Sequence, residues 1–392
     1  MSAFTFPIHI PAESPFGIYN IPFGIYSTKV KPVLNDFAAL PIAVRQYVRQ
    51  TLIENFSNSE SALFTNQELQ SEAILSIEGG QMHLPVKLTD YTDFYTSVVH
   101  AETAGKAMNV PIPQAFWKYP MAYNGRISSV LVSGTDVIRP KGFYPCESED
   151  NRVKLQPSQK LDFEMELGCF ISQPVAPGDV VSAKDAWRHV FGYVLLNDWS
   201  ARDTQRYEMY PFGPFHSKSF LTSVSPWVVT PEALQGSLVG PAPANKMPID
   251  AHLQSDPNNH AAYDIEFSVF LSRNSSAPVK ISRSFLKDSH WDSLQMIAYQ
   301  SSSGCGLHTG DLLGSGTNSS PTPEARDPLS PVGCGCLFEA VSAKIDLPMV
   351  AGQKVTWLED GDRVTMEGWF TTPDGRRAGF GPLTHLVVPA RP

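Results

Sequence analysis

Residues 160–171 constrain the fold most, because side-chain character alternates there with a period of two. Three apolar residues fall on one face of an extended chain and three acidic residues on the other: Phe163, Met165 and Leu167 against Asp162, Glu164 and Glu166. This alternation predicts a β-strand with one face in a core. A second apolar run at 193–196 predicts a buried strand, so we expect a β-rich domain around these two segments.

The acidic face of the first strand suggests a cation site. Glu164 and Glu166 lie about 7 Å apart along an extended backbone, and two such carboxylates repel each other unless a cation lies between them. An exposed strand face is the alternative. Asp198 follows the run at 193–196 and should emerge at a strand end. With Asp93 it completes four carboxylates, an all-oxygen set that selects Mg²⁺, Ca²⁺ or Mn²⁺ rather than zinc.

Residues 82–100 add groups suited to acid–base chemistry. His100 is a candidate general base, since its unperturbed pKa lies near neutrality. The Tyr95 phenol can donate a hydrogen bond to a substrate oxygen. Glu339 lies in an apolar run and needs a partner if buried, for which we select His100. The alternatives are a structural histidine in a polar loop and a capping or ion-pairing role for Glu339.

Arg202, Gln205 and Lys218 are hydrogen-bond donors that follow Asp198 along the chain. Such groups suit an oxyanion site. Four carboxylates and one divalent ion leave a charge of about −2, which Arg202 and Lys218 would offset. Surface charge is the alternative for each of these donors alone.

Composition excludes several classes of protein. A net charge of −9 without a basic block argues against nucleic acid or an anionic membrane as a partner. We expect no signal peptide and no apolar stretch as long as a membrane span. The five cysteines are odd in number and lack Cys-x-x-Cys spacing, so we predict a reducing, cytoplasmic location and no thiolate zinc site.

The pattern of residues along the chain predicts two parts, 1–85 and 86–392. In the first part, helices are expected at 41–56, packed on the large domain through Val44, Val48 and Leu52, and near 65–76. In the second part, helices are expected at 183–191 and near 289–301. Further strands are predicted at 130–132, 226–229, 264–271 and 363–370. A glycine-rich loop is expected at 303–316, and a mobile loop at 316–332.

Several longer motifs make the chain resemble the fumarylacetoacetate hydrolase family over most of residues 15–28 and 82–382. They are Met82-His-Leu-Pro, Asp90-Tyr-Thr-Asp-Phe-Tyr95, Tyr123-x-Gly-Arg126, Leu161-Asp-x-Glu-x-Glu166, Asn197-Asp-Trp-Ser-Ala-Arg-Asp203, Gly213-Pro-Phe215, Lys218-Ser-Phe220, Ser225-Pro-Trp-Val-Val229 and Gly310-Asp-Leu-Leu-x-Ser-Gly-Thr317. The resemblance implies a mixed, β-rich α+β fold with a C-terminal β-roll domain, forming a homodimer.

The resemblance also implies roles for individual residues. Asp93, Glu164, Glu166 and Asp198 would hold a catalytic Mg²⁺ or Ca²⁺, with Lys218 and Thr222 beside a second cation site. His100, oriented by Glu339, would activate water, while Arg202, Gln205 and Lys218 stabilise the oxyanion. The residues expected to contact substrate are Tyr95, Tyr123, Gln205 and Thr317.

The implied reaction is metal-dependent hydrolysis of a carbon–carbon bond in a 1,3-diketone acid. The substrate is expected to be fumarylacetoacetate, in tyrosine and phenylalanine catabolism, or a related acylpyruvate-like compound. Two alternatives are a metal-dependent decarboxylase or tautomerase of a β-keto acid in secondary metabolism, and a non-catalytic binding paralogue.

Three departures from the family pattern affect these expectations. Only about a dozen residues separate Thr28 from the helix expected at 41, too few for the family's N-terminal SH3-like barrel, so we predict a shortened N-terminal domain. Where the family offers an arginine to a substrate carboxylate, the nearest residue is Asn109. Met209 replaces a substrate-binding tyrosine, with Tyr207 and Tyr210 nearby.

Overall fold

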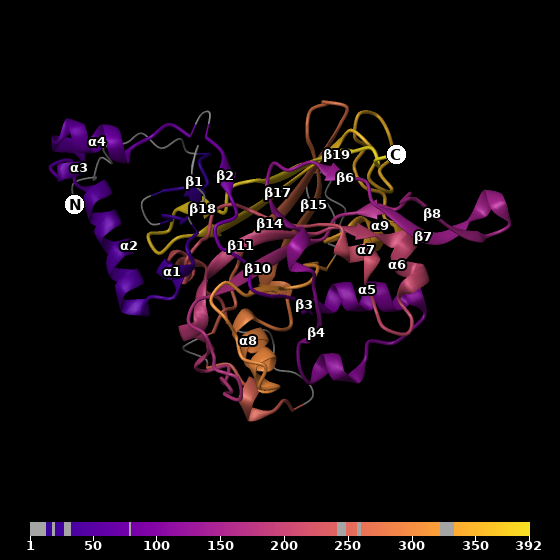
Figure 1. Ribbon diagram of the computed structural model, residues 1–392, viewed down its shortest axis with the longest axis horizontal. Coiled ribbons are helices and arrows are strands. Elements are labelled where there is room, and N and C mark those ends of the chain that lie inside the picture. The colour runs from indigo at the N-terminus through magenta and orange to yellow at the C-terminus, as the bar shows by residue number, and fades with distance from the viewer. Residues whose placement is uncertain are drawn as a thin grey trace.

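Two β-sheets form the centre of the molecule in the computed structural model, which describes residues 13–17, 20–26, 33–77, 80–240, 248–256, 260–321 and 333–392 (Figure 1). The first sheet has seven strands in the order β4-β3-β16-β10-β11-β13-β5. Their bounds are β3 (Tyr91–Tyr95), β4 (Met121–Asn124), β5 (Val130–Val132), β10 (Met165–Ile171), β11 (Val190–Asp198), β13 (Thr222–Val224) and β16 (Leu312–Gly314). Most of the loop expected at 316–332 lies outside the described residues.

The predicted strand at 160–171 and the predicted strand at 193–196 form the middle of this sheet. They pair antiparallel as β10 and β11, with Met165 opposite Asn197 and Cys169 opposite Tyr193. Every residue of both strands is buried, so the acidic face of β10 does not face solvent. Helices and a second sheet must therefore cover both faces.

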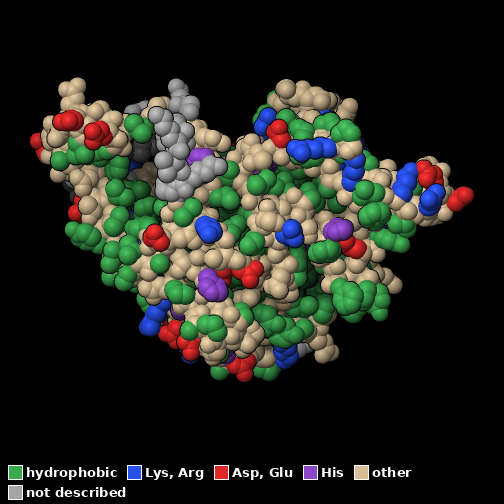
Figure 2. All heavy atoms as spheres, viewed as in Figure 1, with side chains coloured by type: hydrophobic (Ala, Val, Ile, Leu, Met, Phe, Trp, Pro, Cys, Tyr) green, Lys and Arg blue, Asp and Glu red, His purple; other side chains and the backbone are tan. Residues whose placement is uncertain are grey.

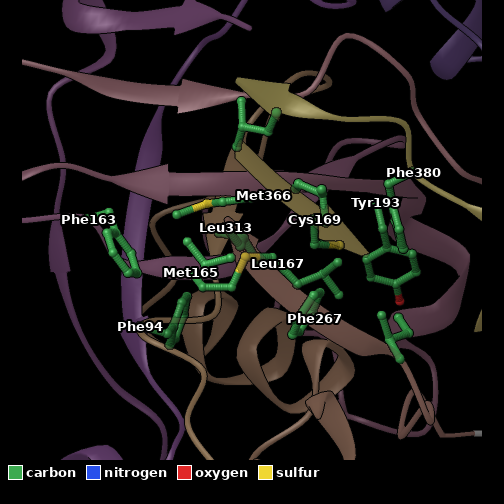
Figure 3. Packing of buried hydrophobic residues seen from close by; sticks show 14 of the residues in the cluster. Phe94, Phe163, Met165, Leu167, Cys169, Tyr193, Phe267, Leu313, Met366 and Phe380 are labelled. Carbon is green, nitrogen blue, oxygen red and sulfur yellow. The ribbon is translucent and has the colours of Figure 1, made fainter. Parts of the chain in front are cut away.

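The second sheet packs against the first and closes the main core. Its strands run in the order β15-β14-β17-β19-β6, with β18 beside β17. Their bounds are β6 (Val137–Ile138), β14 (Glu266–Arg273), β15 (Val279–Phe285), β17 (Asp362–Thr371), β18 (Arg377–Gly379) and β19 (Leu383–Val388). Figure 3 shows Leu167, Cys169 and Leu313 of the first sheet packed with Phe267 and Met366 of the second.

Helices α5, α6, α7 and α9 gather at one end of the molecule, beside a projecting hairpin (Figure 1). Their bounds are α5 (Val98–Met108), α6 (Arg202–Glu208), α7 (His216–Ser219) and α9 (Leu337–Ser342), and the hairpin joins β7 (Lys141–Cys146) to β8 (Arg152–Pro157). Another small ladder pairs β9 (Leu161–Asp162) with β12 (Ser200–Ala201). Helix α8 (Ser293–Ser302) begins at a capping box between Asp292 and Gln295.

The N-terminal part is small and mostly helical. It contains α1 (Asn35–Ala38), α2 (Ile42–Ser57), α3 (Ala62–Thr65) and α4 (Gln67–Ala73), and one ladder of β1 (Ile25–Tyr26) with β2 (Met82–His83). The described residues before 85 thus form no closed barrel, and the prediction of a shortened N-terminal domain is confirmed. The boundary between 1–85 and 86–392 stays a prediction.

The expected packing face of α2 is wrong at Val44, while Val48 and Leu52 are half-buried. Val44 is 42% exposed, whereas Arg45, Arg49 and Ile53 are buried. The Arg45 guanidinium donates to Val190 O and Ser172 Oγ, both at 3.3 Å. A long arginine can place its stem on apolar surface while its guanidinium donates to carbonyl groups, so Arg45 joins this helix to the large domain.

Three other predicted elements differ from the structure. Residues 183–191 form only a 3-10 turn (Ala186–His189), because β11 begins at Val190. Residues 226–229 make isolated bridges at Val228 and Val229 rather than a strand, and the strand of this region is β13. The expected loop at 303–316 contains β16, which pairs with β3 and β10. The strands predicted at 130–132, 264–271 and 363–370 are confirmed.

The surface is mixed in charge. On the face shown in Figure 2, positive and negative side chains are scattered among broad neutral and hydrophobic areas, and no basic patch is visible among the described residues there. Among the described helices, none is both long and apolar enough to cross a membrane.

Candidate active site

Four carboxylates meet at one edge of the seven-stranded sheet. Asp93 comes from β3, Glu166 from β10 and Asp198 from the end of β11, while Glu164 lies just before β10. One oxygen of each lies within 4.8 Å of the others, and all four side chains are buried. The alternative of an exposed strand face for Glu164 and Glu166 is therefore wrong.

The oxygens of this carboxylate cluster are incompletely satisfied by the protein. Asp93 Oδ1 and Glu166 Oε1 are buried without a hydrogen-bond partner among the described residues. Burial, reinforced by the charge of Asp198, raises the pKa of Asp93 well above its ordinary value. Burial and the charge of Asp93 do the same for Glu166. A divalent cation would supply the missing partner and remove this repulsion, so the residues present fit such an ion.

Two cationic side chains lie against the same cluster. Lys218 Nζ is 2.6 Å from both Glu164 Oε2 and Asp198 Oδ2, and Arg202 Nη2 is 2.7 Å from Glu164 Oε1. Burial alone would raise the pKa of Glu164, but Lys218 and Arg202 outweigh it and lower that pKa. The pKa of Lys218 is raised, because Asp198 and Glu164 outweigh the effect of burial. Its ammonium, which has no lone pair, therefore contributes positive charge to the cluster.

A second polar group joins α5 to α9. His100 Nδ1 lies 3.0 Å from Glu339 Oε1, and both side chains are buried. Ser319 Oγ donates to both Glu339 oxygens at 2.8 Å, and the Gly335 N–H donates to Oε2 at 2.7 Å. These donors keep Glu339 an acceptor, so the proton of this imidazole is held on Nδ1 and Nε2 is left as the basic atom.

The pair of His100 and Glu339, which we call the dyad, adjoins the carboxylate cluster. His100 is one of the groups that lower the pKa of Glu164, and the Tyr95 ring packs edge-on against the His100 ring at 5.4 Å. Burial, with Glu339 and Glu164, raises the pKa of Tyr95, so its phenol remains a hydrogen-bond donor. Tyr95 thus contacts His100 directly, and carboxylates of both groups act on its phenol.

The remaining residues expected at the site occupy its margins. Tyr123 OH donates to Asp198 Oδ2 at 3.0 Å, and Thr222 Oγ1 donates to Asp198 Oδ1 at 3.0 Å. Gln205 Oε1 accepts from Arg202 Nη1 at 2.9 Å. Thr317 is buried, three residues beyond the end of β16.

Asp162 is a component of the site that the sequence reasoning missed. Its carboxylate pairs with Arg202 at 2.9 Å and accepts from the N–H groups of Leu337 at 2.7 Å and Phe338 at 2.9 Å. It therefore fixes Arg202 and the first turn of α9, which carries Glu339. Its place on the acidic face of residues 160–171 was the available signal. Ser319 was also missed, and no sequence pattern tied it to Glu339.

The positions that depart from the family pattern lie at the surface. Asn109 is exposed and caps α5 in the left-handed conformation, with φ of 55°. From the last turn of α6 onward the chain exposes a run of apolar side chains, which we call the aromatic segment: Tyr207, Met209, Tyr210, Phe212 and Phe215. The segment follows Arg202 and Gln205 and precedes Lys218, so both of its ends join the site.

Comparison with known proteins shows one family throughout. The model for the fumarylacetoacetate (FAA) hydrolase C-terminal domain matches residues 90–388, and that for the fumarylacetoacetase N-terminal domain matches residues 30–85. A fumarylacetoacetase of Aspergillus fumigatus is 34% identical, with 98% of each chain covered. The fumarylacetoacetase of Oryza sativa is 34% identical over 99% of this chain and 88% of its own.

A solved structure of maleylpyruvate hydrolase from Sphingobium, in complex with manganese(II) and pyruvate, is 14% identical. It covers 95% of this chain and 100% of its own, with a TM-score of 0.47.

Proposed function

This chain belongs to the fumarylacetoacetate hydrolase family and is a carbon–carbon bond hydrolase, and from that premise we propose that it cleaves a 1,3-diketone acid with a divalent cation. Asp93, Glu164, Glu166 and Asp198 would hold the ion. The observation that carries the proposal is the buried carboxylate cluster, with two oxygens unpaired among the described residues, adjoining the His100–Glu339 dyad. A site built only for stability would gain little from four buried acids.

When bound, the ion supplies Lewis acidity that polarises the diketone oxygens and stabilises an enolate. His100 Nε2 removes a proton from water, which adds to one carbonyl carbon. The carbon–carbon bond then breaks, and its electron pair passes to the other fragment as an enolate. His100 returns the proton to that carbon, so one water and one diketone give one carboxylic acid and one ketone.

The other polar residues position and stabilise these species. Glu339 holds Nδ1 of His100 and stabilises the imidazolium that forms when water is deprotonated. Arg202, oriented by Asp162, and the amide of Gln205 would face the oxyanion. Lys218 offsets charge at the carboxylates, while Tyr95, Tyr123 and Thr317 would border the substrate.

The distal end of the substrate would be uncharged or larger than that of fumarylacetoacetate. Asn109 is a surface helix cap and carries no charge, and the aromatic segment presents apolar side chains at both sides of Met209. Such a surface suits an irregular hydrophobic group better than a carboxylate. Fumarylacetoacetate, in tyrosine and phenylalanine catabolism, is the competing substrate. By resemblance we also propose a homodimer and a cytoplasmic location.

Product analysis tests the proposal. The protein is incubated with a panel of 1,3-diketone acids and neutral 1,3-diketones, each with Mg²⁺, Ca²⁺ or Mn²⁺. Equal amounts of acid and ketone, lost on chelation, are the expected result. Release of carbon dioxide, or isomerisation without cleavage, would favour the decarboxylase or tautomerase alternative. Tight binding without any product would favour a binding protein.

A further inference from the structure

Three side chains able to bind a thiophilic metal meet beside the carboxylate cluster. They are His100, Cys336 and Glu339, all buried, with ligand atoms within 4.8 Å of one another. We propose that this His–Cys–Glu cluster is an inhibitory site for Zn²⁺ and similar thiophilic cations, separate from the all-oxygen site. The inhibition rests on the role proposed for His100, whereas the binding itself does not.

The backbone already holds the three groups together. Cys336 is the N-cap of α9, and its side chain accepts the N–H of Glu339 in a capping box. His100 comes from the first turn of α5 and contacts Glu339 directly. Zinc bonds of about 2.0–2.3 Å in a tetrahedron place ligand atoms roughly 3.5 Å apart, so small side-chain shifts suffice.

The chemistry of the donors separates the two sites. A nitrogen and a sulfur ligand favour zinc over Mg²⁺ or Ca²⁺, which prefer carboxylate oxygens. On binding, the Cys336 thiol loses its proton to water as the metal–sulfur bond forms. A thiolate and one carboxylate then balance the two positive charges of the ion, with a neutral imidazole as third ligand. A buried site of zero net charge avoids most of the cost of burying an isolated ion.

Occupation of this site removes the proposed general base. If the metal binds Nε2 of His100, the basic lone pair is used directly. If it binds Nδ1, it replaces the contact with Glu339, and Nε2 must then carry the imidazole proton. In either case His100 can no longer accept a proton from water, so zinc should inhibit even when the carboxylate site is saturated with Mg²⁺.

The sequence alone does not indicate this cluster, because Cys336 and Glu339 lie three residues apart at the start of α9 and His100 is more than 200 residues away in the chain. This proposal departs from the prediction, made from cysteine spacing, that the chain has no thiolate zinc site, because this cluster needs only one cysteine. Cys334, also buried and two residues away, is not in the cluster and supplies a matched control.

The test uses the full-length protein with excess Mg²⁺. Cd²⁺ is added to the wild type, Cys336→Ser and Cys334→Ser, and thiolate-to-metal charge-transfer absorption is followed in the ultraviolet. Serine is itself a good N-cap, so Cys336→Ser should fold. The band is expected to fall in Cys336→Ser by about one equivalent and to persist in Cys334→Ser. Zn²⁺ inhibition should require roughly tenfold or more zinc in Cys336→Ser, because a hydroxyl is a far weaker zinc ligand than a thiolate.

Two results would overturn the inference. One is an unchanged Cd²⁺ band in Cys336→Ser; the other is zinc inhibition that excess Mg²⁺ reverses equally in all three proteins, which would place zinc at the carboxylates. A protein without diketone hydrolysis but with the Cys336-dependent band would refute the proposed function and leave the metal site standing.

Discussion

His100 Nδ1 lies 3.0 Å from Glu339 Oε1, and this contact joins the first turn of α5 to the first turn of α9. Glu339 also accepts hydrogen bonds from Ser319 and the main chain of Gly335. A buried carboxylate with this many donors around it is oriented as a hydrogen-bond acceptor. The imidazole beside it is thereby fixed in one tautomer and one orientation.

Replacing His100 by alanine should abolish most hydrolysis and spare metal binding. General-base catalysis contributes about 10²–10⁴-fold, and Glu339→Gln should cause a smaller loss because Glu339 orients the base without transferring the proton. Steady-state turnover, with divalent-ion binding followed by calorimetry, measures both effects. Near-full turnover in His100→Ala would contradict the hydrolase mechanism and support the decarboxylase alternative.

Divalent ions should stabilise the folded protein through the carboxylate cluster. An ion that binds only the native state adds about 2.7 kcal/mol to the unfolding free energy at a hundredfold excess over its Kd. Asp93→Asn should remove most of this gain, because it replaces a carboxylate with a buried oxygen that no residue in the described part of the chain hydrogen-bonds. Thermal unfolding with Mg²⁺, Ca²⁺ and Mn²⁺ measures it, with the exposed Asp185→Asn as control. Full activity after exhaustive chelation would exclude the metal mechanism.

Asp162→Asn should weaken both the fold and catalysis. The amide would leave Arg202 partly unpaired and set an N–H₂ group against donors from Arg202, Leu337 or Phe338. Breaking a buried ion pair costs about 3–5 kcal/mol. In the control Asp264→Asn, loss of the exposed pair with Lys287 should cost less than about 1 kcal/mol. Chemical denaturation and turnover test this, and equal stability of the two variants would refute it.

His385 should make the fold less stable in mild acid. Burial lowers its pKa from 6.5 to about 4, so as pH falls the unfolded chain takes up this proton first. Stability is therefore complete above pH 6.5 and declines as pH approaches 4, by about 3 kcal/mol for this group. In His385→Asn the curve of unfolding free energy against pH should be flatter over that window. An unchanged slope would show that other groups dominate.

Sequence periodicity could predict the central strands, because apolar residues alternate with acids in the segment that forms β10 and make a nearly continuous run in β11. The acids were recognisable because Glu164 and Glu166 alternate with that apolar face. The periodicity argument failed at α2, where Arg45 and Arg49 are buried together with Ile53 while Val44 is exposed. It failed again at β16, whose three residues are strand only because β3 and β10 flank them.

Contacts between residues far apart in the chain explain why some residues of the site could not be predicted from the sequence. In the sequence, Asp162 is indistinguishable from the other acids of its strand. Only the tertiary fold brings the N–H groups at the start of α9 to its carboxylate. Cys336 likewise acquires its place beside His100 through the contact of α5 with α9. Such relationships depend on tertiary packing and leave no local spacing to recognise.

The final prediction is that neutral-tailed 1,3-diketones are better substrates than fumarylacetoacetate. Loss of an arginine that would pair with a carboxylate costs about 1.5–3 kcal/mol, or roughly 10–150-fold in binding. Asn109, an exposed helix cap, cannot replace that charge, and Met209 lies within the apolar aromatic segment. Met209→Tyr, which adds a hydroxyl donor, should shift the ratio of kcat/KM toward the acid by about 2- to 12-fold, and Met349→Tyr, outside this segment, should not. A wild-type kcat/KM at least about tenfold higher for fumarylacetoacetate would contradict the prediction, because the acid would then be recognised without the arginine.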